Sequence, residues 1–463
     1  MRILFVYTDI NTMGQGEKTY HLGVGMLSAV LKNKGHKTDL VPMYGSLKLN
    51  SLFKKINEFN PDILALTSDT TQFPYVKNII KNTSHLDIFT ILGGVHASLK
   101  PGCLEETEGL DAICIGEGEY SLLDLVNSFN KKPTRYDIEG ICFKTEEGII
   151  RNKTRPFIEN LDSLPYSDRE LFDYQKIIDS DFGRASFMLS RGCPYNCSYC
   201  ASPSMGKIQE GKYVRFMSAE RSIKELKYLK NKYNFNSIFF ADDTFTLDKN
   251  FVIDFCGQFK KEIAVPFEAN SRVESSSKEI FKALKEAGCF KIHIGIESGD
   301  EEFRKEYLNR KMTNSQIINT FKEAREAGLL TKSYNIVGFP CETPQIHQAT
   351  VTINKEIEPD GHVCYIFQPY PGTRLFDVSC EKGFIKPETS NKIIFSRRDT
   401  SLDMPDFSRR EIIKSHQNFS YNVYKAKSLK KALIYRLYYS PLGEILLKIF
   451  NPLKGLLKKC SRI

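Results

Sequence analysis

No run of about eighteen apolar residues occurs in the 463-residue chain, and this absence argues against a membrane-spanning helix. The first ten residues, MRILFVYTDI, lack the apolar length and the small-residue cleavage site of a secretory signal. The composition, with 41% hydrophobic and 26% charged residues, is that of an ordinary soluble protein. We therefore expect a cytoplasmic protein of two or three domains, because one hydrophobic core rarely serves so long a chain.

A basic surface is missing from most of the chain. The net charge of +9 is concentrated after residue 424, where ten Lys and Arg residues stand against one acidic residue, Glu444. The remainder is neutral. Nucleic-acid binding needs clustered Lys and Arg, so we expect no nucleic-acid partner.

The cysteines do not form a disulfide framework, since twelve are present in a large chain without a signal. Nine of them stand singly and are expected to be mostly small buried residues. These nine are Cys103, Cys114, Cys142, Cys256, Cys289, Cys341, Cys364, Cys380 and Cys460. The other three stand together in RGCPYNCSYC at 191–200.

Strands and helices alternate in the first part of the chain. RILFVYT, DILALTS, FTILGG and DAICIG are apolar strand candidates with helical patterns between most of them. Near-continuous apolar strands of this kind predict a parallel sheet covered on both faces, of the doubly wound, Rossmann-like α/β class. Ligands bind at the carboxyl ends of the strands in such sheets.

The alternation resumes at residue 185, after a predicted hairpin and connector. Six strand candidates follow, and the helix ends FKALKEAG at 281–288 and FKEAREAG at 321–328 repeat forty residues apart. A repeated strand–helix unit predicts a β/α barrel of the TIM type, here with six units and therefore partial and open. A second doubly wound sheet is the alternative.

The three clustered thiols are spaced C-x3-C-x2-C directly after a strand candidate. Zinc sites commonly use two separated C-x2-C pairs, and no partner pair is present. A redox pair would leave the third thiol unexplained. Three thiolates on one loop suit a [4Fe–4S] cluster whose fourth iron stays open, with a structural metal knuckle as the alternative. The predicted ligands are Cys193, Cys197 and Cys200.

This arrangement resembles the radical SAM superfamily. The resemblance implies that the open iron binds S-adenosylmethionine (SAM), which is cleaved reductively to a 5′-deoxyadenosyl radical. Further segments match in order: ADDTF at the second strand, ANSRV at the third, GIESG at the fourth, then NIVGFPCET and QPYPGT. The SAM contacts implied are Tyr199, Asp242, Asp243, Arg272, Glu297, Ser298 and Gly299. One departure is Cys341, where relatives often carry Gly, and we expect it to be a packing residue.

The N-terminal segments resemble the cobalamin-binding subclass of this superfamily. The matching segments are YHLGVGMLSAVLKNKGH, LTSDTTQ, ILGGVHAS and IGEGEY. The cobalamin contacts implied are Thr8, Asp9, Ser68, Thr70, Thr71, Gly93, Gly94, Val95, His96, Gly116, Glu117, Gly118 and Glu119. The motif D-x-H-x-x-G, which supplies a lower cobalt ligand in many cobalamin domains, is absent, so no protein ligand to cobalt is assigned.

The resemblance implies a cobalamin-dependent radical SAM enzyme that methylates an unactivated carbon of a small-molecule or lipid substrate. Its cofactors would be a [4Fe–4S] cluster, SAM and cobalamin, with flavodoxin or ferredoxin as electron donor. A radical cyclase, like the anaerobic magnesium-protoporphyrin cyclase, is an alternative, and a non-catalytic cobalamin sensor is another. A methylthiotransferase is disfavoured, because the cysteines of the first domain do not cluster.

Four regions follow: 1–135 for cobalamin, 136–184 as hairpin and connector, 185–400 as the radical SAM barrel and 401–463 as a helical end. The basic segment 425–463 mixes Leu, Ile, Phe and Tyr with Lys and Arg. Such segments lie on anionic membrane surfaces or pack as a helix with Lys stems on the protein, and both interpretations stay open. Contact with the inner face of the membrane would favour a lipid substrate. We expect a monomer.

Overall fold

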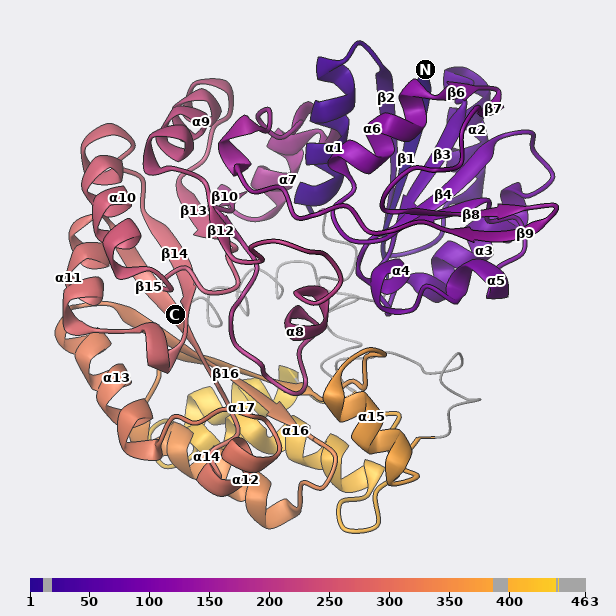
Figure 1. Cartoon of the computed structure of the whole chain (residues 1–463). Helices are drawn as coiled ribbons and strands as arrows, with labels where there is room; N and C mark the ends of the chain where they lie inside the picture. The colour runs from indigo at the N-terminus through magenta and orange to yellow at the C-terminus, as the bar shows by residue number, and fades with distance from the viewer. Residues whose placement is uncertain (11–18, 386–398, 439, 441–463) are drawn as a thin grey trace.

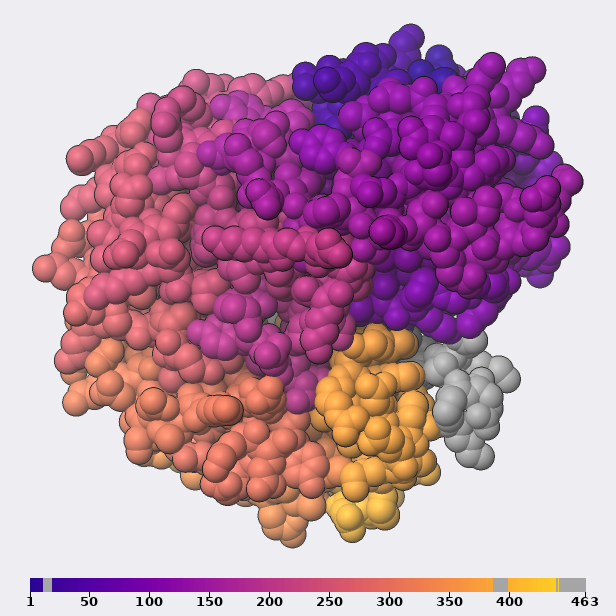
Figure 2. All heavy atoms as spheres, viewed as in Figure 1, coloured from indigo at the N-terminus to yellow at the C-terminus, as the bar shows by residue number. Residues whose placement is uncertain are grey.

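A computed structural model of the chain describes residues 1–10, 19–385, 399–438 and 440. Two parallel sheets dominate it, one in the N-terminal third and one in the middle of the chain (Figure 1). The two bodies built on these sheets pack directly against each other (Figure 2). The α/β class and the order of the two units agree with the sequence prediction.

The first sheet has the strand order β2-β1-β3-β4-β5-β8-β9. Its five parallel strands are β1 (Arg2–Asp9), β2 (Lys37–Tyr44), β3 (Ile63–Thr67), β4 (Phe89–Gly93) and β5 (Ala112–Cys114). One face buries apolar residues against α1 (Leu22–Asn33) and α6 (Glu119–Asn127). The opposite face packs on α2 (Leu49–Phe59), α3 (Phe73–Thr83), α4 (Val95–Leu99) and α5 (Cys103–Glu106). Burial on both faces explains why the strands are apolar throughout.

The predicted hairpin extends this first sheet. Strands β8 (Ile141–Thr145) and β9 (Gly148–Arg151) pair antiparallel, and β8 pairs antiparallel with β5. The connector continues through α7 (Tyr174–Ser180) into the second sheet. A buried ion pair of 2.7 Å between Arg169 and Glu225 fixes the connector to the barrel.

The second sheet is a curled, open half-barrel of six parallel strands in chain order. The strands are β10 (Arg184–Phe187), β13 (Ser237–Phe240), β14 (Phe267–Ser271), β15 (Cys289–Glu297), β16 (Leu330–Val337) and β17 (Gly361–Ile366). Outside them lie α9 (Ala219–Lys232), α10 (Lys249–Glu262), α11 (Lys278–Glu286), α13 (Asn314–Glu326) and α14 (Pro344–Ile357). The order never reverses, so the alternative of a second doubly wound sheet is wrong.

The repeated helix ends have the same local geometry. Gly288 and Gly328 follow α11 and α13 with φ angles of +100° and +77°. This left-handed conformation strains any residue with a Cβ atom, so glycine ends both helices and turns the chain into the next strand.

After β17 the chain forms α15 (Arg374–Glu381), α16 (Arg409–Tyr424) and α17 (Leu429–Tyr438). Helix α17 packs along α16 and leaves Leu429, Leu433 and Leu437 exposed. Within the described residues, no helix is both long and apolar enough to cross a bilayer. The predicted membrane segment 425–463 falls largely outside the described residues.

Candidate cofactor site and active site

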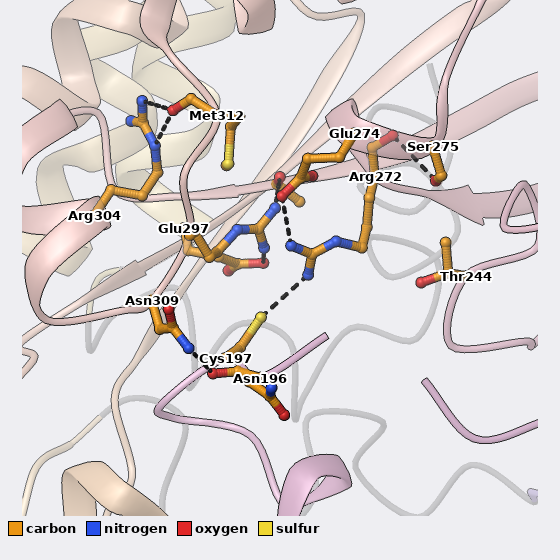
Figure 3. A network of polar contacts seen from close by, with 12 residues as sticks. Asn196, Cys197, Thr244, Arg272, Glu274, Ser275, Glu297, Arg304, Asn309 and Met312 are labelled. Atoms are coloured by element: carbon orange, nitrogen blue, oxygen red, sulfur yellow. Dashed lines mark hydrogen bonds and ion pairs between the residues drawn. The ribbon is translucent and has the colours of Figure 1, made fainter. Parts of the chain in front are cut away.

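The three clustered cysteines lie on the loop between β11 (Ser190–Arg191) and α8 (Ser202–Met205). Each sulfur faces a hydrogen-bond donor. Arg272 donates from Nη1 to Cys197 Sγ over 3.1 Å (Figure 3), and the backbone N–H of Ser202 donates to Cys200 Sγ over 3.4 Å. The Thr244 hydroxyl lies 3.9 Å from Cys193 Sγ. Donors directed at sulfur stabilise thiolate ligands, so the loop fits an iron–sulfur cluster.

The cysteine loop is not arranged as a site for a single metal ion. In the described part of the chain, no three His, Cys, Asp or Glu side chains gather to hold one ion. Burial raises the pKa of Cys193 and raises that of Cys200 to about 11, so a bound cationic group is needed to keep them as thiolates. Three thiols on one loop suit a cluster that leaves one iron open, whereas a single-ion site needs its ligands gathered around one point.

Arg272 extends from the end of β14 toward the cysteine loop. Its Nη2 pairs with Glu274 over 2.8 Å, and its guanidinium carbon lies 3.8 Å from the centre of the Tyr195 ring. With Cys197 as a third partner, the side chain is fixed on the loop (Figure 3). The expected contact of Arg272 with a SAM carboxylate therefore has to share the guanidinium with these groups.

Glu297 ends β15 in an unusual backbone conformation, with φ of +70° beside a strand irregularity at Gly295. Arg310 donates to Glu297 over 3.3 Å and to the Tyr199 hydroxyl over 3.0 Å. Burial raises the pKa of Glu297. A Cβ atom at Gly295 would lie 2.6 Å from Glu297 Oε1, so a side chain here would push the carboxylate out of this position. Sequence reasoning missed Arg310, which belongs to none of the matched segments.

The two aspartates after β13 point in different directions. Asp242 is buried, and its Oδ1 accepts hydrogen bonds from the Leu189 N–H over 3.0 Å and from the Ser190 hydroxyl. Burial raises the pKa of Asp242 to about 6. Asp243 lies in the wall of a cavity, and among the described residues no hydrogen-bonded partner fixes it; burial raises its pKa. Of the two, Asp243 is the acceptor that a cationic ligand group can reach.

Ser298 and Gly299 have packing roles in this geometry. Ser298 is fully buried and accepts the backbone N–H of Asp300 over 3.4 Å. A Cβ atom at Gly299 would lie 2.3 Å from the carbonyl oxygen of Ala349. Gly299 holds the turn after β15 against α14, and Ser298 bonds within the turn.

A cavity of about 410 Å³ opens at the carboxyl ends of β3, β4 and β5 and continues between the sheet and helices α1 and α6. Its lining in the first domain includes Gly93, Gly94, Val95, Gly116, Glu117, Gly118 and Glu119. The barrel contributes Met188, Ser190, Arg191, Gly192, Met205 and Asp243. A Cβ atom at Gly93 would meet only Cys114, at 3.9 Å, so this glycine keeps the cavity open. The volume is within the range of pockets that hold small molecules and cofactors.

Six predicted cobalamin contacts lie outside this cavity lining: Thr8, Asp9, Ser68, Thr70, Thr71 and His96. Several of them are hydrogen-bonded locally. Asp9 accepts the Thr19 hydroxyl over 2.7 Å, and Thr70 lies 3.2 Å from His96 Nδ1. Burial lowers the pKa of His96 to about 4, so the ring is neutral. Leu22, Gly23, Val24 and Thr67 of the lining lie inside the matched segments, but sequence reasoning did not select them as contacts.

A second cavity, of about 560 Å³, adjoins the first. It lies between α7, the start of α1 and the inner face of β10 and β13, and it includes Tyr20, Arg184, Ser186 and Phe239. Four residues line both cavities: His21, Leu22, Gly23 and Met188. The half-barrel therefore opens sideways onto the cavity of the first domain.

Comparisons with known proteins agree with this geometry. Residues 187–351 match the family model of the radical SAM superfamily, and residues 15–126 match that of the B12 binding domain. An uncharacterized methyltransferase of Pyrococcus horikoshii is 32% identical over 400 residues, which cover 85% of each chain. The anaerobic magnesium-protoporphyrin IX monomethyl ester cyclase of Rubrivivax gelatinosus is 25% identical, over 81% of this chain and 69% of its own.

The fold is also found in a radical S-adenosylmethionine methyltransferase of Kitasatospora setae, solved with cobalamin and a [4Fe–4S] cluster bound. That structure has a TM-score of 0.67 at 18% identity and covers 82% of this chain and 78% of its own. The chain belongs to the radical SAM superfamily, as an enzyme with a B12-binding domain whose cofactors are a [4Fe–4S] cluster, SAM and cobalamin.

Proposed function

We propose that this enzyme transfers a methyl group to an unactivated carbon of a small-molecule or lipid substrate. One observation carries the proposal. The cavity of the B12-binding domain has Gly192 and Asp243 in its wall, and Gly192 directly precedes the first cysteine of the cluster loop. Two cofactors bound in these places would face each other across a short space, where proximity favours transfer.

The bound cluster and SAM supply a 5′-deoxyadenosyl radical, and methylcobalamin supplies the methyl group. The residues of the chain hold and orient these groups. Cys193, Cys197 and Cys200 would ligate three irons, and Asp243 would accept the SAM ammonium as a charge-assisted partner. Glu297, held by Arg310, would accept hydrogen bonds from ribose hydroxyls.

The substrate would bind in the second cavity, which adjoins the cobalamin cavity. Its volume of about 560 Å³ suits a medium-sized organic molecule, and its shared wall with the first cavity supports a direct approach to cobalamin. Most of the lining is apolar, which would keep water away from the reacting carbon. The polar groups of Tyr20, Arg184 and Ser186 are candidates for orienting the substrate.

The names of several relatives support the proposal of methyl transfer. Besides the Pyrococcus protein, the cytidylyl-2-hydroxyethylphosphonate methyltransferase of Streptomyces wedmorensis and the hopanoid C-3 methylase of Methylococcus capsulatus are 21% and 25% identical. The identity of 25% to the Rubrivivax cyclase keeps radical cyclisation as the second candidate. A non-catalytic sensor is disfavoured by the cysteine triad together with Asp243 and Glu297.

The test uses the whole chain, loaded with cluster and cobalamin without oxygen and supplied with SAM carrying a labelled methyl group. Flavodoxin or ferredoxin would serve as electron donor. We expect 5′-deoxyadenosine together with S-adenosylhomocysteine, because methyl transfer consumes a second SAM. A cyclase would give 5′-deoxyadenosine without S-adenosylhomocysteine, and a sensor would give neither. Vesicle co-sedimentation with and without residues 425–463 would test membrane contact.

A further inference from the structure

The acidic turn of the first domain reaches across to the cluster loop. Arg191 lies two residues before Cys193, and its two terminal nitrogens pair with two different carboxylates. Nη1 lies 2.8 Å from Glu117 and Nη2 lies 2.6 Å from Glu119. Both glutamates come from the turn Gly116–Glu119 after β5. A single side chain of the barrel therefore binds both acidic residues of this turn.

A second arginine completes the contact. Arg215, on β12 (Arg215–Phe216), lies opposite Arg191 in a short antiparallel pair. It binds Glu117 through two parallel hydrogen bonds of 2.9 Å, and its side chain is only 3% exposed. Paired geometry of this kind is specific to arginine, since a lysine ammonium has no planar pair of parallel N–H groups.

The Glu117 carboxylate has no acceptor position left for a ligand. Its Oε1 accepts from Arg191 and Arg215, and its Oε2 accepts from Arg215 and from the backbone N–H of Ile158 over 2.9 Å. Each oxygen therefore already accepts two hydrogen bonds, the usual number for a carboxylate oxygen. Although Glu117 lines the cavity, these contacts argue against the direct cobalamin contact expected for it.

The backbone of the turn also touches the barrel. The Glu117 N–H donates to Oε1 of Gln209 over 2.9 Å. A Cβ atom at Gly116 would lie 2.2 Å from the same oxygen, and the φ of Gly116 is +80°. Glycine is needed here because the side chain of the barrel occupies the space.

We propose that the turn Gly116–Glu119 and the pair Arg191 and Arg215 form an interdomain clamp that positions the cluster loop relative to the cobalamin cavity. In this role Glu117, Glu119, Arg191 and Arg215 are positioning residues. The proposal rests on the proposed function, because positioning matters only if both cofactors act together. A misplacement of about 1 Å between reacting groups costs about a hundredfold in rate, which explains a rigid contact at this point.

The test compares Arg191→Lys, Arg191→Gln and Glu119→Gln with the wild-type chain. Arg374→Gln is the matched control, because Arg374 forms an exposed ion pair with Glu381, which is not one of the clamp residues. Two measurements do not depend on turnover. Hydrogen exchange of the amides of residues 192–201 is followed in cofactor-free protein. The magnetic interaction between cob(II)alamin and the reduced cluster is followed by electron paramagnetic resonance (EPR) in the loaded protein.

We expect the Arg191 and Glu119 variants to keep corrinoid and iron at wild-type amounts. Exchange in 192–201 should accelerate by about tenfold or more, because an unpaired buried charge weakens the contact. The EPR interaction should change in the same variants and stay unchanged in Arg374→Gln. If Arg191→Gln does not fold, Arg191→Lys and Glu119→Gln carry the test.

Unchanged exchange and an unchanged magnetic interaction in folded variants would overturn the clamp. Loss of corrinoid from Glu119→Gln with both readouts at wild-type values would instead assign this carboxylate to cobalamin and also overturn it. The proposed function fails separately, if the wild-type chain itself gives no 5′-deoxyadenosine.

Discussion

The Arg272 guanidinium donates a hydrogen bond to Cys197 Sγ over 3.1 Å and thereby joins the end of β14 to the cluster loop (Figure 3). Reduction adds negative charge to a cluster, and a cationic donor at a ligand sulfur stabilises that charge. Replacing Arg272 with Met should therefore lower the midpoint potential of the bound cluster. EPR-monitored redox titration measures this, with Arg374→Gln as control. A potential equal to that of the wild type would remove the proposed role of Arg272.

Each of the three loop cysteines should be needed for the cluster. Changing Cys193, Cys197 or Cys200 to Ala should abolish the cluster absorbance and most of the bound iron after anaerobic reconstitution. The matched control is Cys341→Gly. Cys341 has a φ of +69°, which strains a residue with a side chain, and its replacement should leave iron content unchanged and the free energy of unfolding within about 1 kcal/mol. Full iron content in any of the three alanine variants would contradict the assignment.

Substitutions of Asp242 and Asp243 should have different effects, the first on the stability of the fold and the second on SAM binding. Asp243→Asn removes a charged acceptor at the cavity and should weaken SAM binding about 10- to 100-fold, without loss of stability. Asp242→Ala leaves the Leu189 N–H and the Ser190 hydroxyl without an acceptor and should destabilise the fold by about 1–3 kcal/mol. Calorimetric SAM titration and denaturant unfolding measure the two effects. Equal effects of both variants on SAM affinity would contradict this division.

Gly93 should control access to the cobalamin cavity. A Cβ atom at Gly93 has only Cys114 within 4 Å and Gly93 lines the cavity, so Gly93→Leu should fold, fill cavity space and purify without corrinoid. Gly102→Leu is the control, because a Cβ atom there meets nothing within 4 Å and Gly102 does not line the cavity. Corrinoid absorbance after growth with cobalamin is the readout, and normal absorbance in Gly93→Leu would count against this cavity.

Glu342 should make stability depend on pH. Its carboxylate is fully buried beside His347, and burial raises its pKa to about 8 from an ordinary value of 4.5. The native state thus keeps a proton that the unfolded state loses above pH 4.5, so stability falls as the pH rises from 4.5 to 8. The loss is on the order of 5 kcal/mol.

Glu342→Gln should remove this fall, because the amide carries no charge. His347, whose pKa burial lowers to about 4, makes stability fall below pH 6.5 in both proteins. Denaturant unfolding at pH 6.5, 7.5 and 8.5 therefore measures the effect of Glu342 on stability without that of His347. Parallel pH profiles of the two proteins would contradict the raised pKa.

The architecture could be predicted from the sequence because its signals are local. Continuous apolar strands indicated a parallel sheet covered on both faces. Gly288 and Gly328 indicated the repeated helix ends of the half-barrel. The cysteine triad is likewise contained within eight residues. Each of these patterns depends on neighbours along the chain and needs no knowledge of how domains dock.

The polar partners could not be predicted in the same way. Arg215 lies 98 residues from Glu117, and Arg191 lies 74 residues from it, so their ion pairs exist only once the two domains meet. The direction of Asp242 depends on the backbone of a neighbouring strand end, which sequence spacing does not reveal. Contacts of this kind decide which residues of a motif are free to bind a ligand.

The most direct test of the account is Mössbauer spectroscopy of the full chain reconstituted with ⁵⁷Fe, before and after addition of SAM. The account predicts a [4Fe–4S] spectrum in which one iron site becomes distinct from the other three when SAM is present. A spectrum without such a cluster, or one that SAM leaves unchanged, would contradict the account.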